Sequence, residues 1–381
     1  MPDPTIARGC TVIELFPARR RDRKRFVDLP FSLAKSIEPW HPGLRLFFEA
    51  LIDPARNPFW EGREAWYFAA IRDGRIVGRM GLLDVGNFPP RPAAAVMLMP
   101  DFVDDASVVA CLLDAVESRA LERGARELVG PMNPNIHHDI GVQVSGFERR
   151  NTIFMGYQPP YYARRLEASG FRPLAELQAW ELYQESFLQE GRLRRLVDRV
   201  ERQPSLRIRS VELRRFDRDL AIFFHLYCGA FSDHWGFVPP TWEEFKFIAG
   251  DIRHILRANM ALVAEWDGQP VGFVLGVPDL YGIIPKASRG RLTPKLVLDV
   301  LRKWRRVDEV RVMIAGVLPT HRRYGVHLSL FYRITCAIFD LGFRGGEISW
   351  VMKDNAPMAK VLPLLGARPT KTYRLFHKTL G

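Results

Sequence analysis

The segment from Val310 to Leu328, VRVMIAGVLPTHRRYGVHL, combines residue types that could bind a phosphate group. It is typical of a buried strand, then a basic turn with one glycine, then the start of a helix. A helix start leaves backbone N–H groups unpaired and carries partial positive charge, so phosphate oxygens bind there. Arg322 and Arg323 add charge, and Gly325 permits close approach to the backbone. The segment predicts an anion-binding site, and an ordinary turn with solvated arginines is the alternative.

The elements that must position this turn follow it in a regular order. A helix over 326–343 precedes a strand, EISWVMKD at 347–354, a second helix, PMAKVLPLLG at 357–366, and a last strand at 371–379. This order resembles the core of the GNAT acyltransferases, in which a strand, a pyrophosphate loop, a helix and a further strand bind acyl-CoA. The resemblance implies an α/β fold with a mixed sheet and acyl-CoA as the co-substrate.

The loop of that family reads R/Q-x-x-G-x-G/A, and Arg322, Gly325 and His327 occupy its first, fourth and sixth places. His327 departs from the pattern and would crowd the third backbone donor. The resemblance implies that acyl-CoA contacts a set of residues around the loop and the second helix: Val317, Arg322, Arg323, Tyr324, Gly325, Val326 and Asn355.

Asn355, followed eleven residues later by Gly366, also matches the family's strand-to-helix signature. The family's usual Tyr, seven residues after the Asn, is Leu362 here. In many relatives that Tyr protonates the leaving thiolate. Tyr373, on the following strand, is the first candidate for this role, and a half-buried packing Tyr is the alternative.

The composition is that of a globular protein with more than one domain. The chain has 381 residues and 47% apolar content, so it can bury a large core and is long for one domain. Its four cysteines form no C-x-x-C pair and no metal spacing with histidine, which predicts free thiols, no metal and a reducing compartment. No apolar run reaches the roughly 18 to 20 residues of a membrane span, and no signal peptide is evident, so we expect a cytoplasmic protein.

A formal charge of +12 and a pI near 9.8 predict attraction to polyanions, whether CoA, nucleic acid or an anionic membrane surface. One basic cluster, from Arg19 to Arg25, precedes a run of apolar side chains: Phe26, Leu29, Phe31 and Leu33. Basic residues beside apolar ones predict a peripheral contact with the anionic inner membrane. A solvated basic face is the alternative.

Two parts of the chain repeat one plan. Residues 64–84 and 259–279 each read as two strands joined by an Asp-Gly turn, at Asp73 and at Asp267. Each pair is followed by a strand, a helix, a strand and a helix ending in Gly, which indicates a tandem duplication. The first copy has acidic residues, DFVDDAS at 101–107, where phosphate would bind, so we expect it to be degenerate. The expected domains are 1–183 and 204–381, joined by a helical linker over 184–203.

The whole length resembles a group of bacterial GNAT proteins that includes the bacterial ceramide synthases. Several short motifs carry this resemblance: NPFW at 57–60, GPMNPN at 130–135, HWGF at 234–237 and EISW at 347–350. The resemblance implies transfer of a long acyl chain from acyl-CoA to the amine of a sphingoid base, either sphinganine or its 3-oxo precursor. The product would be a ceramide.

In such a reaction a neutral amine attacks the thioester carbonyl, and a backbone N–H near Ala315 to Val317 stabilises the oxyanion. The strand VRVMIAGV has no carboxylate or histidine to accept the amine's proton. His234, Glu347 and Asp279, in that order, are the candidates for the base, each acting directly or through water. A hydrogen-bonded turn residue is the alternative for each of these side chains.

Aromatic residues are candidates for the walls of a long-chain channel, namely Trp235, Phe237 and Trp350. Packing in the core is the alternative for all three. Period-two alternation along 347–352 predicts that Trp350 lies on the opposite face of the strand from Glu347. If the acyl group binds on the tryptophan face, Glu347 points away from it.

Three other functions remain open from the sequence. The acceptor could be another amine, such as an amino acid or a lipid amine. Tandem GNAT folds also occur in aminoacyl-tRNA-dependent transferases, but the retained arginine-glycine loop favours CoA, so we expect no nucleic acid partner. A catalytically silent, membrane-binding protein is the third alternative, because of Leu362 and His327.

Overall fold

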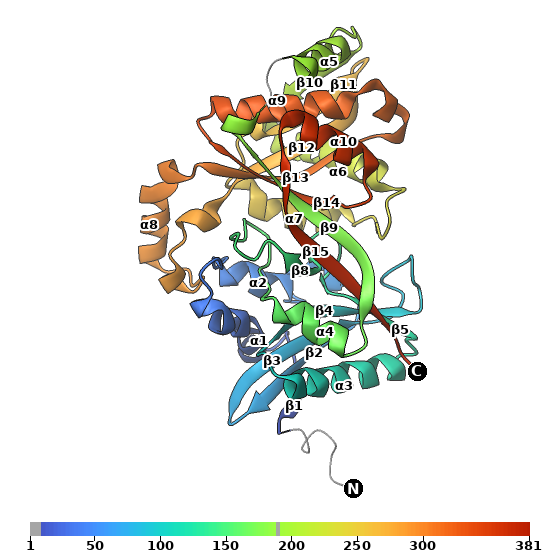
Figure 1. Cartoon of the computed structure of the whole chain (residues 1–381), viewed down its shortest axis with the longest axis vertical. Helices are drawn as coiled ribbons and strands as arrows, with labels where there is room; N and C mark the ends of the chain where they lie inside the picture. The colour runs from blue at the N-terminus through green and yellow to red at the C-terminus, as the bar shows by residue number, and fades with distance from the viewer. Residues whose placement is uncertain (1–8, 188–190) are drawn as a thin grey trace. The chain divides into compact units, whose positions relative to one another are not determined.

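The computed structural model describes residues 9–187 and 191–381, and its contacts divide the chain into two compact units (Figure 1). Unit 1 comprises the chain up to Glu176 with Ile284–Leu301 and Lys371–Gly381. Unit 2 comprises Leu177–Ile283 and Arg302–Thr370. Each unit therefore includes segments from both sides of the boundaries expected at 183 and 203. The last strand, for example, belongs largely to unit 1.

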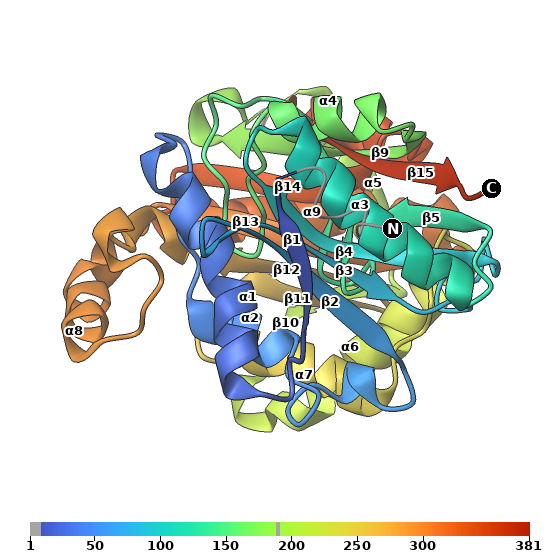
Figure 2. The ribbon, with the colours of Figure 1, turned by 90° about the horizontal axis from the view of Figure 1, so that it is seen from below.

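Unit 1 contains a sheet with the strand order β1-β2-β3-β4-β5-β15, in which β8 also pairs with β15 (Figure 2). The β4–β5 pair is parallel, and the other neighbours from β1 to β4 are antiparallel. Its helices and strands are β1 Thr11–Leu15, α1 Arg20–Leu33, α2 Arg45–Leu51, β2 Ala65–Arg72, β3 Arg75–Leu83, β4 Ala94–Phe102, α3 Ala106–Glu122, β5 Glu127–Gly130, β6 Met132–Asn133, β7 Asp139–Ile140, β8 Val142–Ser145, α4 Tyr161–Ala168, most of α8 Pro294–Lys303 and most of β15 Arg368–Thr379.

Helices cover both faces of the sheet in unit 1. Phe68 and Ala70 of β2 belong to the core under α3, whereas the ring of Tyr67 lies 5.0 Å from that of Phe26 in α1. This is the period-two alternation of a strand buried on both sides. The apolar residues that follow the Arg19–Arg25 cluster are thus mostly buried in unit 1, with Phe26 only 1% exposed. The membrane contact predicted from this cluster lacks the apolar surface that it required.

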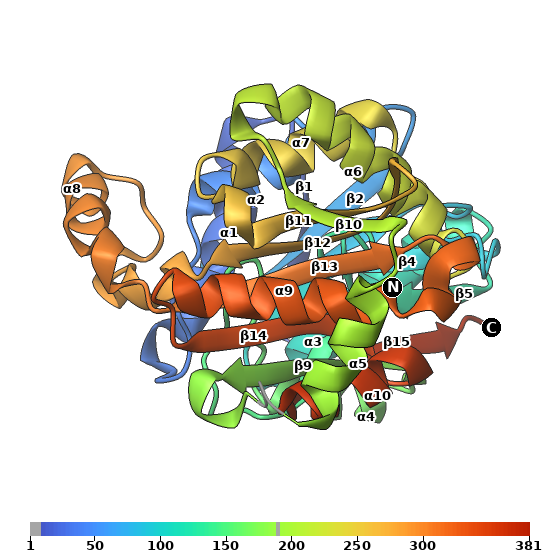
Figure 3. The same cartoon turned by 90° about the horizontal axis from the view of Figure 1, so that it is seen from above.

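Unit 2 contains a sheet with the order β9-β14-β13-β12-β11-β10, and its β13–β14 pair is parallel (Figure 3). Its helices and strands are β9 Arg172–Tyr183 from Leu177 onward, α5 Arg192–Glu201, β10 Leu206–Ser210, α6 Phe216–Phe231, α7 Trp242–Arg253, β11 Ala261–Trp266, β12 Gln269–Pro278, β13 Glu309–Val317, α9 Val326–Asp340, β14 Gly345–Met352 and α10 Ala356–Leu365. The helix expected in the linker is α5, and it packs with α9.

The two faces of this sheet carry different helices. Leu262 and Ala264 of β11 join the core that contains α9, while Ala261 and Val263 join the core that contains α6. Figure 3 shows α9 along one face and α6 and α7 over the other. The α6 face of β13 is therefore enclosed by a helix that must be held in place at both ends.

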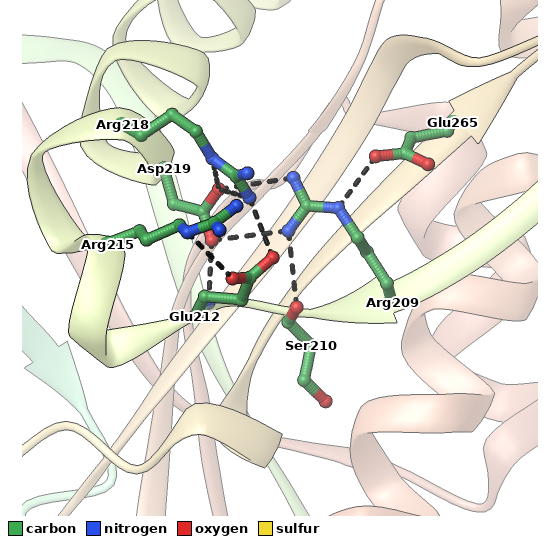
Figure 4. A network of polar contacts seen from close by, with 7 residues as sticks. All are labelled: Arg209, Ser210, Glu212, Arg215, Arg218, Asp219 and Glu265. Atoms are coloured by element: carbon green, nitrogen blue, oxygen red, sulfur yellow. Dashed lines mark hydrogen bonds and ion pairs between the residues drawn. The ribbon is translucent and has the colours of Figure 1, made fainter.

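A polar network holds the start of α6 (Figure 4). Arg209 of β10 donates to Asp219 at 3.2 Å and to Glu265 at 2.6 Å, and the Glu212 N–H donates to Asp219 at 2.7 Å. Burial alone would raise the pKa of Asp219, but the hydrogen bonds from Arg209, Glu212 and Arg218 outweigh it and lower this pKa. The negative charge stays in the first turn of α6, where it stabilises the helix.

The sheets confirm the predicted repeat. Asp73 and Gly74 have φ values of 49° and 71°, and Asp267 and Gly268 have 48° and 77°. Positive φ at both central residues defines the type I′ turn, which suits a two-residue hairpin. Both units then place a parallel strand pair after the hairpin. The expectation of an α/β fold with a mixed sheet and two copies of one plan is confirmed.

The helices that follow the fourth strand of each copy begin differently. In unit 1, Asp105 caps α3 by accepting from the Ser107 N–H at 2.8 Å, and it also pairs with Arg72 at 2.7 Å. In unit 2, α9 begins after Gly325 without a side-chain cap. Its first N–H groups remain available to an anion, whereas a carboxylate already serves those of α3.

Two further observations bear on the sequence predictions. All four cysteines are free thiols, as expected. Within the described residues, no helix has the length and apolar character needed to cross a bilayer.

We predict that Gly346→Ala abolishes stable folding of unit 2. Gly346 has φ +151°, and an added Cβ would lie 1.9 Å from the carbonyl oxygen of Val310 on the neighbouring strand. The β13–β14 pair would have to separate, so we expect a loss of more than about 3 kcal/mol or no soluble protein. Urea unfolding measures the change. In the control, Gly250→Ala within α7, a Cβ meets nothing within 4 Å and should stabilise by up to about 1 kcal/mol. Equal stability of both variants would contradict this reading.

Candidate active site

The central feature of unit 2 is the point at which two parallel strands separate. The β13–β14 register runs from Glu309 opposite Gly345 to Val312 opposite Ile348. Beyond Val312, β13 continues beside β12 as far as Val317, with a register shift between Leu275 and Gly276 that leaves Met313 as an extra residue. The bulge and the end of the parallel pairing coincide. After Met313, the edge of β13 that faced β14 is therefore no longer paired with that strand, while the other edge still pairs with β12. This is the separated part of the strand that we expected near Ala315 to Val317.

The end of α6 packs closely on this part of β13. A Cβ on Gly316 would lie 2.8 Å from the Cβ of Ala230, and one on Gly229 would lie 2.7 Å from Leu318. Both glycines therefore permit a closer approach than other residues would. The helix end and the separated strand form one wall of the candidate site.

Arg322 joins the turn after β13 to the end of α6. Its guanidinium donates to both carboxylate oxygens of Asp233, at 2.7 and 2.9 Å, and to the Ala230 carbonyl at 2.8 Å. Its Nε donates to the Val317 carbonyl at 3.3 Å. The hydrogen bond from Arg322 lowers the pKa of Asp233 to about 2. Arg322 thus shapes the turn, in addition to supplying positive charge.

The remaining turn residues contact each other and the last residue of β11, Trp266. The ring of Tyr324 lies 4.6 Å from that of Trp266, with 30° between the planes, and Arg323 donates to the Tyr324 hydroxyl at 2.7 Å. Gly325 has φ 76°, and its Cβ position would lie 2.8 Å from a methyl group of Val200. Glycine at this position therefore allows both the left-handed backbone conformation and the close packing of Val200 on α5. A ligand has to approach Val326 and His327 from the N-terminal end of α9.

Asn355 is a helix cap. Its Oδ1 accepts from the Met358 N–H at 3.1 Å at the start of α10. Leu362, in the place of the family's Tyr, is fully buried in the core beside α9. Gly366 has φ 92°, and an added Cβ would lie 1.8 Å from the Ser186 carbonyl oxygen. These contacts fix both ends of α10.

His234 follows α6 and lies beside the turn. Its half-buried ring is 4.8 Å from that of Phe231, and the charges that act on it belong to Asp233, Arg322 and Asp354. Burial, followed by the charge of Arg322, lowers its pKa below 6.5 against the opposing effect of the two carboxylates. The imidazole is neutral at pH 7 and can accept a proton. The neighbouring carboxylate of Asp233 binds Arg322.

A buried polar cluster lies where the strands separate. Arg311 of β13 is 2% exposed and donates to the Ser349 hydroxyl at 3.0 Å and to its carbonyl at 3.2 Å. The same hydroxyl donates to Glu347 Oε1 at 2.6 Å. The Arg311 guanidinium lies 4.8 Å from the centre of the Trp350 ring. A cation, a hydroxyl, a carboxylate and an indole thus occupy adjacent positions.

The predicted alternation along β14 is wrong. The pairing with β9 shifts between Ile348 and Val351, and both of these residues join the core beside α9. The bulge returns Trp350 to the face that carries Ser349 and Glu347. Glu347 does not point away from the tryptophan.

Two other candidate residues lie elsewhere. Asp279 follows β12 at the Glu309 end of β13, and its carboxylate accepts from the Tyr281 N–H at 3.1 Å in a turn. The anion turn is at the other end of that nine-residue strand. Tyr373 is fully buried on β15, in the part that belongs to unit 1, where it is opposite Gln143 of β8.

Of the two aromatic candidates besides Trp350, one is exposed and the other is packed against the core. Trp235 is 40% exposed beyond the end of α6. Phe237 packs on Tyr227 at 5.4 Å and on Phe231 at 6.0 Å, within the aromatic cluster between α6 and α7. No group of His, Cys, Asp or Glu in residues 9–187 and 191–381 is arranged to hold a metal ion.

Comparison with solved structures identifies the architecture. A tandem GNAT protein from the clavulanic acid biosynthesis pathway aligns with a TM-score of 0.57, 12% identity, and coverage of 98% of this chain and 99% of that one. A GCN5-related N-acetyltransferase from Sphaerobacter thermophilus aligns with a TM-score of 0.52, 13% identity, and coverage of 97% and 96%. The chain has a tandem GNAT fold. The expected fold class is confirmed over its full length.

Two curated proteins are similar in sequence to this tandem GNAT chain. The bacterial ceramide synthase of Caulobacter vibrioides is 28% identical over 370 residues, which cover 94% of each protein. Protein YghO of Escherichia coli is also 28% identical, over 385 residues that cover 95% of this chain and 94% of that protein. No protein-family model matches the chain.

Our sequence reasoning missed Arg311, Ser349 and the ion pair between Asp233 and Arg322. A signal for Arg311 was present, because an arginine inside the apolar strand VRVMIAGV has to find a buried partner. The partners of Arg322 had no such signal, since Asp233 is 89 residues away in the sequence.

We predict that Ser349→Ala destabilises the protein by about 1 to 3 kcal/mol, because it leaves Arg311 and Glu347 without the hydroxyl that joins them. Urea unfolding measures the change. Ser232→Ala is the matched control: its exposed hydroxyl donates to the Gly229 carbonyl at 3.1 Å, so its loss should cost less than about 0.5 kcal/mol. A Ser349 variant as stable as this control would show that the cluster does not depend on the hydroxyl.

Proposed function

We propose that this chain is an N-acyltransferase that moves a long acyl chain from acyl-CoA to the amine of a sphingoid base, 3-oxosphinganine or sphinganine, to form a ceramide or its 3-oxo form. The proposal rests on one arrangement: strand β13 leaves β14 after Val312 and then leads into a turn that carries Arg322 and an uncapped helix start. The similarity to the Caulobacter vibrioides ceramide synthase over 94% of both chains supports the choice of acceptor.

The turn and the strand have separate tasks in this reaction. The N–H groups at the start of α9, with the charges of Arg322 and Arg323, would bind the pyrophosphate of acyl-CoA. The edge of β13 after Met313 would receive the thioester, where a backbone N–H stabilises the oxyanion that forms during attack. The carbon–nitrogen bond then forms, the carbon–sulfur bond breaks, and the thiolate leaves.

His234 is our first choice for the base that accepts the amine's proton. Burial keeps its ring neutral at pH 7, and it lies among charges that belong to the turn and to the β14–α10 connection. The charges of Asp233 and Asp354 would stabilise the imidazolium that results. Glu347 is the second choice, because the Ser349–Trp350 bulge brings it to the tryptophan face.

Both proposed substrates are amphiphiles, so peripheral contact with an anionic membrane surface belongs to this proposal, as does a cytoplasmic location. Trp235 and Trp350 are the aromatic residues that we assign to the acyl or sphingoid chain. For Trp235 this assignment accounts for a large side chain that is 40% exposed.

The decisive measurement is CoA release from palmitoyl-CoA with and without 3-oxosphinganine or sphinganine, with products identified by mass spectrometry. We expect amine-dependent release and an N-acyl product. Arg322→Ala with Arg323→Ala should lower kcat/KM by about 100-fold or more, because binding charge and the Asp233 contact are lost together.

The matched control is Arg207→Ala with Arg214→Ala, which removes the same charge from exposed positions of unit 2. This variant should retain parent activity. CoA binding without release to either amine would exclude the sphingoid acceptor and direct the search to amino acids or other lipid amines.

A second prediction concerns pH. The ring of His234 is protonated below its lowered pKa and cannot then act as a base. His234→Gln should reduce kcat/KM by about 10²- to 10⁴-fold at pH 8. The parent-to-variant ratio should decline toward one as pH falls through that pKa, and the ratio cancels the titration of the substrate amine.

His225→Gln, an exposed histidine on α6, the helix that precedes His234, is the control and should match the parent at every pH. A ratio that does not change with pH would exclude proton transfer to His234, and Glu347→Gln would be tested next.

A further inference from the structure

Helix α8, Pro294–Lys303 (orange in Figure 1), has apolar side chains that are exposed to solvent. Val297 is 42% exposed, Leu298 45% and Leu301 67%, and Leu292, just before the helix, is 54% exposed. Large exposed apolar side chains scattered singly are normal on a protein surface. Four within ten residues form a patch, and such patches mark interaction sites.

The helix is packed by one face and leaves the other uncovered. Leu296 is 3% exposed and Val300 is half-buried, and four-residue spacing places them on the same side. Leu298 and Leu301 fall on the opposite side, and Val297 lies at its edge. A helix on a protein surface normally has polar residues there, so the apolar outward face requires another explanation.

Unit 1 holds the start of this segment firmly. The backbone N–H of Arg45 donates to the Gly290 carbonyl at 2.9 Å, and its side chain donates to the Arg289 carbonyl at 2.7 Å. A Cβ on Gly290 would lie 2.1 Å from the Gly43 carbonyl oxygen, so the segment packs directly on backbone. The segment that leads into α8 is thus fixed on unit 1.

Basic residues accompany the apolar face. Lys295, Arg302 and Lys303 belong to α8, and Arg305 and Arg306 follow it, against one acidic residue within the helix, Asp299. These five basic side chains form no ion pair with the described part of the chain. Their charge is available to an anionic partner.

We propose that α8 is an interfacial element that binds the surface of an anionic lipid bilayer. Val297, Leu298 and Leu301 enter the boundary between headgroups and acyl chains, and the basic residues bind the headgroups. At about 1.5 Å per residue the helix is only about 15 Å long, so binding is reversible and depends on charge as well as on apolar contact. A second copy of this chain is a poorer occupant, because symmetric pairing would bring the same cations together.

The proposal relocates the predicted membrane contact. The basic cluster at Arg19–Arg25 leads into α1, whose Phe26 and Phe31 are 1% and 3% exposed. Arg23 also binds Asp53 at 3.1 Å. Helix α8 has the exposed apolar residues that α1 lacks. The inference concerns binding alone and does not rest on the proposed reaction.

The test is co-sedimentation of the full chain with vesicles, without acyl-CoA or amine. We expect binding to vesicles of phosphatidylcholine and phosphatidylglycerol in equal parts, and little to phosphatidylcholine alone. Salt should weaken it, because the screening length falls from about 10 Å at 0.1 M to about 3 Å at 1 M. Leu298→Glu with Leu301→Glu should lower the partition coefficient by about tenfold or more.

Leu121→Glu is the matched control, because this α3 residue is 47% exposed, close to the 45% of Leu298. It should bind like the parent. Arg302→Gln with Lys303→Gln leaves the apolar face intact and should weaken binding to the anionic vesicles by about threefold or more.

Parent-like vesicle binding by the double glutamate variant would overturn the proposal. The proposal would also be overturned if light scattering found that the parent is a dimer and the double glutamate variant a monomer. The apolar face of α8 would then bind a second copy of the chain.

Discussion

The separation of β13 from β14 after Val312 and Ile348 is the constraint around which unit 2 is organised. Two parallel strands that stay paired would satisfy each other's backbone and leave no opening. The extra residue at Met313 coincides with the end of the pairing, and Gly316 beyond it packs against Ala230 of α6. A protein needs such an edge if its own N–H groups are to meet a substrate carbonyl.

Because the opening weakens the sheet, other contacts have to hold its walls. Helix α6 is fixed at its start by the Arg209–Asp219 network of Figure 4 and at its end by Arg322, which donates to the Ala230 carbonyl. On the inner side, Arg311 spans from β13 to Ser349 at the last paired positions. Charged hydrogen bonds thus replace the missing strand ladder at each border of the opening.

The sequence predicted the features that depend on local chemistry. The Asp-Gly hairpins and the uncapped start of α9 follow from neighbouring residues, and both are present. Features that depend on distant contacts were not predictable. A bulge shifts alternation by one residue, so the face of Trp350 came out wrong. The partner of Arg322 comes from another helix.

The same limit applies to surfaces. Basic residues beside apolar ones occur in both α1 and α8, and their sequences do not tell which apolar side chains are covered. Tertiary packing buries those of α1 and leaves those of α8 outside. Composition therefore predicted attraction to an anionic partner, and only the fold shows which apolar side chains lie exposed beside basic ones.

The membership of β15 in unit 1 has a consequence for how the chain is made. Lys371–Gly381 completes a sheet whose other strands lie before Glu176, and the residues of unit 2 are synthesised between them. The edge of β5 that pairs with β15 therefore stays unpaired until almost two hundred further residues have left the ribosome. An open strand edge is a site for wrong pairing, so slow translation or early termination should cost this protein more than one whose repeats fold in order.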